Sequence, residues 1–590
     1  MPTSQIKVRS ESSVFEVQTS EADDASTRLR QLPDQKLELN KSGTGYQERF
    51  HWSLVLNNTS ESGLSHRRDV EASDPNTGAY QPIFQQTPGI LLLRGCKRAS
   101  KEELLSNVPA RPVVDRLVAH YFSSTDYSLC IIHRVEFLKQ YEMFWQSPIS
   151  VPIPWLGLLY AVICISKQFQ NPDVRASGIT EAVDAQSAGV SALIQLYRES
   201  IVQCLVLAQY TRGGEFIVET MIHYLVVESY FRRDSDEEIW MVLGTLVQIA
   251  IRMGYHRDAR HFAKLSAFDG EMRRRVWSTV YQMDLSVSTQ LGMPRIVKDS
   301  IADAAKPLNL MDSDFGAHSE TLPVPRPKGE VTPAALLGVK SEIMFVIGEI
   351  SDLITNPRGF AYEEARKLDI KLQQCHESIP EECKHKHLSH CITDSPQLIC
   401  QRIYVEILYH RGQILLHQRY MALSRDSNEY SYSRETAVNA ALSILRFQQL
   451  LDEESRPGGR VDAGWIRSSF LNHDFLLATS VVYFCATRLA GGMGDTEADE
   501  MSELTAKSEA IWCRTRLCST EAKKASEALR TAVKELGQLR EEARCDERQQ
   551  FADDPASNYA LASDFQFPFS TLDMMLQGEQ LDRYHGFGNF

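Results

Sequence analysis

Apolar residues recur at helical spacing through much of the chain, and the clearest case is the segment EEIWMVLGTLVQIAIRMGYHRD, which starts at Glu237. Its apolar residues return every three or four positions: Ile239, Leu243, Leu246, Ala250 and Met253. This spacing predicts a helix with one buried stripe. Asp236 or Ser235 can cap its start, and Gly254 is placed to end it.

A second helix is predicted in GEMRRRVWSTVYQMDLSVSTQLGMPRIV, which starts at Gly270. The residues expected to face inward are Val276, Val280, Met283 and Val287. Glu271 stands four residues before Arg275, the favoured order for an ion pair on a helix. Gly292 and Pro294 then end the helix. The two helices and their Gly-Met-Pro exit are the segment around which the rest of the chain is organised.

Helical periodicity continues on both sides, and convincing strand alternation is missing. We expect helices near 155–169, 192–208, 214–232, 333–355, 362–379 and 403–419, with a helix pair inside 111–145. A proline-rich surface loop is expected at 307–328. The sequence therefore predicts an all-α fold, with one large multi-helix domain over residues 110–495.

The two ends of the chain differ from this domain. Residues 1–109 are rich in Ser, Thr, Gln and acids, which favours a largely disordered region. Residues 496–550 are rich in Ala, Glu, Lys and Arg and predict a long exposed helix, with an apolar repeat too sparse for a coiled coil.

The tail, residues 551–590, alternates acidic with large apolar residues. The apolar residues that carry this pattern are Phe565, Phe567, Phe569, Leu572 and Met575. Such alternation is typical of a disordered segment that folds on a coactivator. The alternative is a C-terminal strap that docks on the protein's own core.

Composition narrows the class of protein. The 590 residues carry a net charge of −14, so any contact with DNA must be local. The 12 cysteines are scattered, which fits a reduced compartment. No secretory leader is visible, and we expect no membrane-spanning segment.

The two-helix segment also resembles a known family. Its residues are similar to the fungal-specific transcription factor domain, the middle homology region of fungal binuclear zinc-cluster transcription factors. The matching residues are Ala250, Gly254, His256, Arg257, Asp258, Glu271, Arg273, Arg274, Arg275, Trp277, Asp284, Gly292 and Pro294. Tyr255, Ser278 and Met293 depart from the family pattern. Further resemblances lie in Ile403–Arg419 and in Asn472–Leu477, so the match covers roughly 111–489.

The resemblance implies a nuclear regulator whose helical domain controls activity, sometimes through a small-molecule effector, and often with homo- or heterodimerisation. Family members usually carry an N-terminal module of six cysteines that hold two zinc ions. Here the first cysteine is Cys96 and the next is Cys130, so we expect no cofactor in this chain, and zinc only if a missing cluster exists. Contact with DNA then requires either a zinc-cluster module encoded by a lost upstream exon or a DNA-binding partner.

The signature residues include three consecutive arginines and a histidine. Arg273, Arg274 and Arg275 could suggest a phosphate site, but three consecutive helical residues spread over nearly 300° and share no face. We expect them to pair with acids such as Glu271 or Asp284. His256 and Arg257 follow a helix C-terminus, where cations are favoured.

No metal or catalytic site is predicted. The segment Cys375–Cys391 is dense in Cys and His, but its spacing matches no common zinc finger, and we interpret it as a polar loop. Phosphate-binding, nucleophile-elbow and metalloprotease motifs are absent from the sequence. We expect no enzyme.

The sequence therefore favours a transcriptional regulator of a metabolic or biosynthetic gene set, located in the nucleus. Two alternatives stay open. The first is a stand-alone effector-binding or adaptor module without DNA contact, and the second, a helical enzyme, would need a closed polar cavity with convergent acids or histidines.

Overall fold

The computed structural model describes residues 36–40, 43–47, 51–53, 55–56, 89–124, 130–170, 185–424, 428–461, 468–489 and 495–553. Helices dominate these residues, which confirms the predicted all-α class. The exception in the described part is a short antiparallel hairpin of β1 (Lys36–Asn40) and β2 (Gly43–Gln47). Met1–Leu536 forms one compact unit and Gly537–Phe590 a second.

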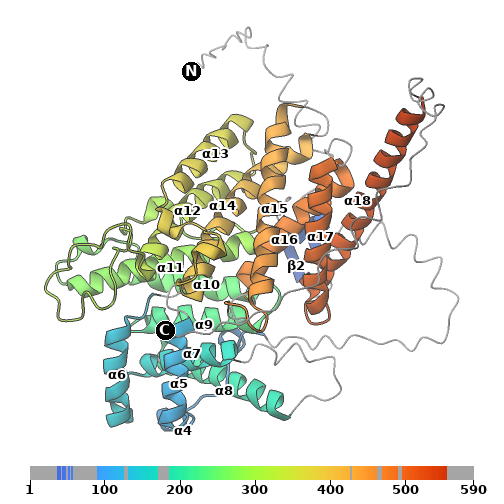
Figure 1. The fold of residues 1–590 in the computed structure, drawn as a ribbon. Helices are drawn as coiled ribbons and strands as arrows, with labels where there is room; N and C mark the ends of the chain where they lie inside the picture. The colour runs from blue at the N-terminus through green and yellow to red at the C-terminus, as the bar shows by residue number, and fades with distance from the viewer. Residues whose placement is uncertain are drawn as a thin grey trace, which may run out of the picture. The chain divides into compact units, whose positions relative to one another are not determined.

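The helices follow one another along the chain as coloured in Figure 1. Their bounds are α3 Leu91–Arg94, α4 Lys101–Ser106, α5 Arg111–Ser124, α6 Arg134–Gln146, α7 Ile153–Gln170, α8 Ala185–Leu207, α9 Ile217–Phe231, α10 Glu237–Arg252, α11 Ala267–Leu291, α12 Pro333–Ile354, α13 Tyr362–Glu377, α14 Pro396–Leu423, α15 Ser431–Glu454, α16 Ser469–Phe484, α17 Asp495–Thr515 and α18 Thr520–Asp553.

Two helices form the centre of the packing. α7 is buried at every residue from Trp155 to Ser166 and packs against α5, α8 and α9. α14 packs against α12, α13, α15 and α16. A helix that is apolar all round must be covered on every side, so α7 fixes the positions of its neighbours.

The helix ends follow the capping residues. Asp236 accepts a hydrogen bond from the backbone N–H of Glu238 at the start of α10, in agreement with the sequence. α11 begins earlier than predicted because Ser266 caps it by accepting from the N–H of Asp269. It ends at Leu291, where Gly292 adopts a left-handed conformation with φ of 65°.

Order before residue 110 is more extensive than the expected boundary suggests. Helices α3 and α4 precede that position, and Ser100 forms a reciprocal capping box with Glu103 at the start of α4. Ile90 and Leu104 are fully buried in the main core. The expected boundary at residue 110 therefore falls after two helices that belong to the domain.

The segment expected as one long exposed helix is instead two helices, α17 and α18, each with a buried face. The buried apolar residues are Met501, Leu504, Trp512, Ala522, Ala525, Ala528, Leu529, Ala532 and Leu536. The prediction of an exposed helix was wrong because four of these nine residues are alanine, whose small side chain gives only a weak apolar period.

Within the described residues, one stretch, Ala188–Leu207 of α8, has the length and apolar composition of a membrane-spanning helix. Arg198 in its middle forms a buried ion pair with Glu228 of α9, with Nε–Oε1 and Nη2–Oε2 distances of 3.0 and 2.8 Å. Its neighbours Ile194, Tyr197 and Ile201 are buried in the core. This packing accounts for the apolar composition of α8.

Candidate functional site

The signature residues lie on α10, on α11 and in the loops that follow each helix. Gly254, with φ of 76°, ends α10 in a conformation that residues other than glycine adopt at a cost. The backbone carbonyl of His256 accepts hydrogen bonds from the N–H groups of Asp303 and Ala304, at 3.0 and 3.2 Å. The loop after α10 is thereby joined to the segment that follows α11.

Asp258 is the centre of this junction. Its carboxylate accepts hydrogen bonds from the backbone N–H groups of Arg260 and Ala305, at 2.9 and 3.0 Å, and from the guanidinium groups of Arg260 and Arg274. Burial alone would raise its pKa, but these donors hold the pKa of Asp258 well below its usual range. Asp258 therefore stays ionised and fixes three separate segments.

Burial, with the adjacent charge of Arg257, lowers the pKa of His256 below its ordinary value, and a hydrogen bond with the backbone of Ile251, in the last turn of α10, opposes that shift. Its ring lies against Trp277, with centroids 6.0 Å apart. Arg257 does keep its charge and pairs with Asp303 at 2.9 Å.

The three consecutive arginines of α11 are all engaged inside the fold. Arg273 donates to the carbonyl of Met253 and stacks on the ring of Tyr255. Arg274 contacts Asp258 and Glu271, at 3.4 and 3.5 Å. This geometry provides no shared face for a phosphate.

Arg275 is fully buried and ties α11 to the long loop before α12. Its Nη1 atom donates to Asp312 at 2.7 Å, its Nη2 atom donates to the carbonyl of Leu310 at 3.0 Å, and its Nε atom lies 3.3 Å from Glu271. Glu271 also accepts from the N–H of Leu308 at 3.1 Å. The predicted Glu271–Arg275 pair is thus part of a larger hydrogen-bond network that joins α11 to the loop before α12.

Asp284 meets none of the three arginines, which corrects the expected pairing. It instead accepts hydrogen bonds from the backbone N–H groups of Ile296 and Val297, at 3.2 and 2.7 Å. Burial raises its pKa, and these two N–H groups oppose that rise. Gly292 and Pro294 turn the chain back along α11, which brings residues 296 and 297 beside Asp284.

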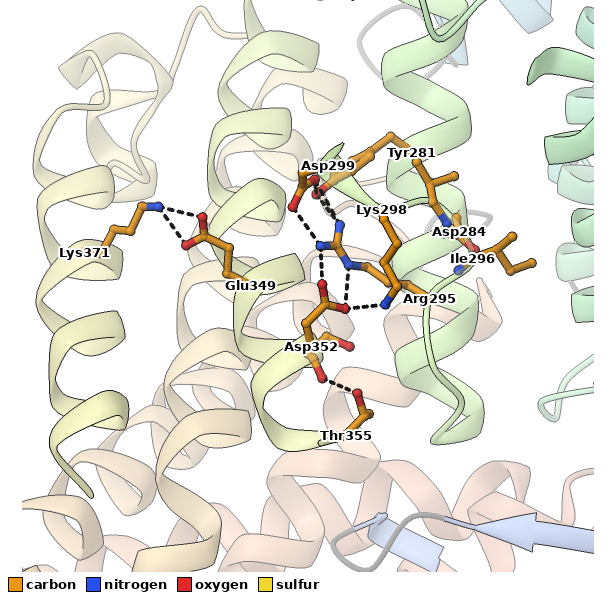
Figure 2. Close-up of polar contacts among 12 residues, drawn as sticks. Tyr281, Asp284, Arg295, Ile296, Lys298, Asp299, Glu349, Asp352, Thr355 and Lys371 are labelled. Atoms are coloured by element: carbon orange, nitrogen blue, oxygen red, sulfur yellow. Dashed lines mark hydrogen bonds and ion pairs between the residues drawn. The ribbon is translucent and has the colours of Figure 1, made fainter. Parts of the chain in front are cut away.

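Arg295, directly after Pro294, joins this turn to α12. Figure 2 shows its guanidinium between Tyr281, Asp299 and Asp352. The contacts are 3.1 Å to the Tyr281 hydroxyl, 2.7 and 3.0 Å to the carboxylate of Asp299, and 2.7 and 3.0 Å to the carboxylate of Asp352. Lys298 donates to Asp352 at 2.7 Å. Every N–H of Arg295 is satisfied, so the network holds the exit turn against two helices.

The two later family resemblances meet each other in space. Arg411 of α14 and Asp474 of α16 form a bidentate ion pair with distances of 2.5 and 2.6 Å, and both side chains are buried. His473 beside this pair is also buried, and its ring stacks on His51 with centroids 6.4 Å apart. The two later resemblances therefore join α14 to α16 through a buried ion pair.

A cavity of about 160 Å³ lies among the central helices. Its lining comes from α7, α9, α11, α12, α14, α15 and the start of α16, and includes Phe169, Met283, Met344, Ile403 and Leu471. Most of the lining is apolar. Hydroxyls in it are satisfied locally, as where Ser229 donates to the carbonyl of Val226 at 2.9 Å and Thr279 donates to the carbonyl of Arg275 at 3.0 Å.

Among the lining residues of the cavity, Lys340 alone carries a charge. It lies on α12 and is 4% exposed, and its Nζ atom donates to Oε1 of Gln401 on α14 at 2.7 Å. Burial lowers the pKa of Lys340 to about 8. Sequence reasoning missed this residue, although a lysine between Leu337 and Met344 in an apolar helix was the available signal.

The described lining of the cavity lacks the convergent acids or histidines that a helical enzyme would need. Its described lining residues include no Asp, Glu or His. In the described part of the chain no group of three or more His, Cys, Asp and Glu side chains could hold a metal ion. Within Cys375–Cys391, His376 instead pairs with Glu406 at 2.8 Å, and His385 packs on Phe447.

The proposed activation residues Phe565, Phe567, Phe569, Leu572 and Met575 lie outside the described residues. Their role stays a prediction from the sequence.

Comparisons with known proteins agree with the resemblance. The fungal specific transcription factor domain matches residues 118–341. The equisetin cluster transcription factor of Fusarium heterosporum is 37% identical over 494 residues, which cover 82% of this chain and 70% of the relative. The fusarisetin A cluster transcription factor of a Fusarium species is 38% identical, over 82% of this chain and 65% of the relative. A Zn(2)-C6 fungal-type transcription factor of Monascus ruber is 39% identical, over 77% of this chain and 55% of the relative.

The chain thus spans between 55% and 70% of the length of these three relatives. Similarity extends beyond the matched domain into the later helices, where Arg411 and Asp474 lie. The chain belongs to the family of transcription factors that carry the fungal specific transcription factor domain, and it is a transcriptional regulator.

Proposed function

We propose that this protein acts in the nucleus to control the transcription of one biosynthetic gene cluster. The observation that supports this is its similarity, over 82% of its length, to a factor named for the equisetin cluster and to one named for the fusarisetin A cluster. The product of the cluster controlled by this chain is a separate question, because a regulatory domain does not determine the chemistry of the enzymes it regulates.

Contact with promoter DNA is proposed to come from outside the helical domain. The net charge of −14 disfavours broad contact with DNA, which is a polyanion. The three signature arginines already make contacts inside the domain, to Met253, Asp258 and Asp312. Two routes fit: a zinc-cluster module encoded upstream of this chain, with its own zinc, or a DNA-binding partner with which this chain forms a heterodimer.

The helical domain is proposed to transmit regulation, with a small-molecule effector as its input. The cavity lies where α11 and α12 meet α14, so a ligand there would contact α11, the helix that carries Glu271, Arg275 and Asp284 of the signature. The tail with Phe565, Phe567 and Phe569 is proposed to supply the contact with a coactivator.

Deletion of the gene followed by transcript profiling tests the regulatory role. We expect the transcripts of one contiguous biosynthetic cluster to change together, and reintroduction of the wild-type gene to restore them. An unchanged transcriptome under conditions that induce the fungus's clusters would contradict the proposal and would favour the adaptor without promoter contact.

A triple alanine substitution of Phe565, Phe567 and Phe569 tests the tail. If the tail recruits a coactivator, loss of these rings lowers cluster transcripts toward the deletion level while promoter occupancy stays. The matched control is the triple alanine substitution of Tyr584, Phe587 and Phe590, aromatic residues of the same tail outside the acidic-aromatic run, which should leave transcripts unchanged. Equal effects of the two triples, or loss of protein from the first, would contradict an activation segment and favour the strap.

A further inference from the structure

The apolar cavity contains a cation without an anionic partner in the described part of the chain. Lys340 is buried, and the polar contact that the structure gives its Nζ atom is the neutral amide oxygen of Gln401. A buried ammonium that lacks a carboxylate is costly, and most buried cations are paired for this reason. The neighbouring buried arginines Arg275, Arg295 and Arg411 do each have a carboxylate.

Lys340 and Gln401 offer hydrogen-bond donors to the cavity beyond the contact that they make with each other. An ammonium has three N–H donors, and one of them is used by Gln401. Because an ammonium cannot accept, the amide oxygen of Gln401 must be the atom that faces it, and the amide nitrogen is therefore turned elsewhere. No acceptor for that nitrogen is found among the described residues. The ammonium of Lys340 and the amide nitrogen of Gln401 can each donate a hydrogen bond to one oxygen of a carboxylate.

The size and polarity of the cavity limit the ligand. A cavity of about 160 Å³ is comparable with an engineered apolar cavity of roughly 150 Å³ that binds benzene. The surrounding apolar residues disfavour any second charge on the ligand. A phosphate, with close to two negative charges, would need more cations than Lys340 supplies.

We propose that this cavity binds a small organic acid with an apolar body of about one ring, whose carboxylate accepts hydrogen bonds from Lys340 and Gln401. The binding itself is a property of the cavity, and its consequence for transcription rests on the function proposed above. A bound acid would contact α11, α12 and α14 together, and so would stabilise their packing.

Titration calorimetry of the purified full-length chain with sodium benzoate tests the proposal. We expect saturable binding at pH 7 that weakens by about tenfold or more for benzamide, the neutral isostere, because a charge-assisted contact is lost. Lys340→Met should weaken benzoate binding similarly. The control Lys306→Met removes an exposed lysine that pairs with Glu342 near the same helix, and it should bind as the wild type does.

A second variant distinguishes a loss of benzoate binding from a folding defect. Met344, one turn after Lys340 on α12, also lines the cavity, and Met344→Trp fills the space while it leaves the ammonium in place. It should abolish benzoate binding and leave cooperative unfolding intact. The proposal is overturned if neither benzoate nor phenylacetate binds the wild type, or if Lys340→Met and Met344→Trp both bind benzoate as tightly as the wild type.

The pH dependence adds a readout specific to Lys340. Affinity for benzoate should fall as pH rises above about 8, where the ammonium loses its proton. Other titratable groups near it are the thiols of Cys130 and Cys400 and the hydroxyls of Tyr230 and Tyr404. Burial raises the pKa of Cys130 and of Tyr404, so these two groups stay neutral over this range. A flat profile from pH 6 to 9 would contradict the assigned role of Lys340.

The two proposals can fail separately. A wild-type protein that controls its cluster but binds no small acid overturns the cavity assignment alone. Binding that depends on Lys340, in a protein whose deletion changes no transcript, overturns the regulatory proposal alone.

Discussion

At the scale of single residues, the fold depends on buried charges that are paired across long sequence separations. Asp258, Glu271 and Asp284 each accept backbone N–H groups from the segment after α11, and Arg411 pairs with Asp474. Periodicity marks such residues as unusual on an apolar face, but it does not identify partners. The expected meeting of Asp284 with an arginine was wrong because the Gly292–Pro294 turn brings backbone donors to it first.

Removal of one partner of the Arg411–Asp474 pair should be strongly destabilising. Arg411→Ala leaves Asp474 buried and unpaired, which costs about 3–5 kcal/mol in the free energy of unfolding. The matched control is Arg446→Ala, which breaks an exposed pair with Glu500 and should cost at most about 1 kcal/mol. Urea unfolding measures both, and equal losses would show that the buried pair has no special role.

Lys340 predicts a pH dependence of stability in the ligand-free protein. Its pKa is about 8 in the fold and 10.5 in the unfolded chain, so the unfolded chain binds the proton more tightly between these values. Stability contributed by this residue therefore rises with pH from about 8 to 10.5, by up to roughly 3 kcal/mol, at about 1.4 kcal/mol per pKa unit. Unfolding curves of the wild type and of Lys340→Met should converge as pH rises through this window. Parallel curves would mean that Lys340 is not buried as a cation.

At the scale of helices, the sequence predicts where a helix begins most accurately when large apolar residues recur at helical spacing. The helices at 333–354 and 362–377 begin where expected, at Pro333 and Tyr362, because the caps and the apolar stripes agree. α11 began early because Ser266 supplied an unrecognised cap. The burial of α17 and α18 was not predicted, because alanine packs closely between helices but contributes little to an apolar pattern.

A pair of leucine substitutions tests the burial of α18. Leu529 is fully buried, whereas Leu517, in the connection before α18, is 53% exposed. Leu529→Ala should lower the free energy of unfolding by about 2–5 kcal/mol, whereas Leu517→Ala should change it by less than about 0.5 kcal/mol. If the two variants have the same stability, α18 is the exposed helix that the sequence pattern indicated.

At the scale of the whole molecule, the sequence supplied the fold class and the family, and the structure supplied the organisation of the site. The signature residues were identified from their order along the chain, but their role in fixing residues 296–312 to α11 and to the loop after α10 required coordinates. The cavity could not be predicted, because its lining is drawn from helices spread over about 300 residues of sequence. Lys340 and Gln401 become neighbours only when α12 packs against α14.

We propose that this chain regulates a biosynthetic gene cluster from the nucleus. Chromatin immunoprecipitation of the epitope-tagged, full-length protein, followed by sequencing, tests it most directly. We expect enrichment at the promoters of one contiguous cluster, whose transcripts also change when the gene is deleted. A protein that lies outside the nucleus and is enriched at no promoter would contradict it.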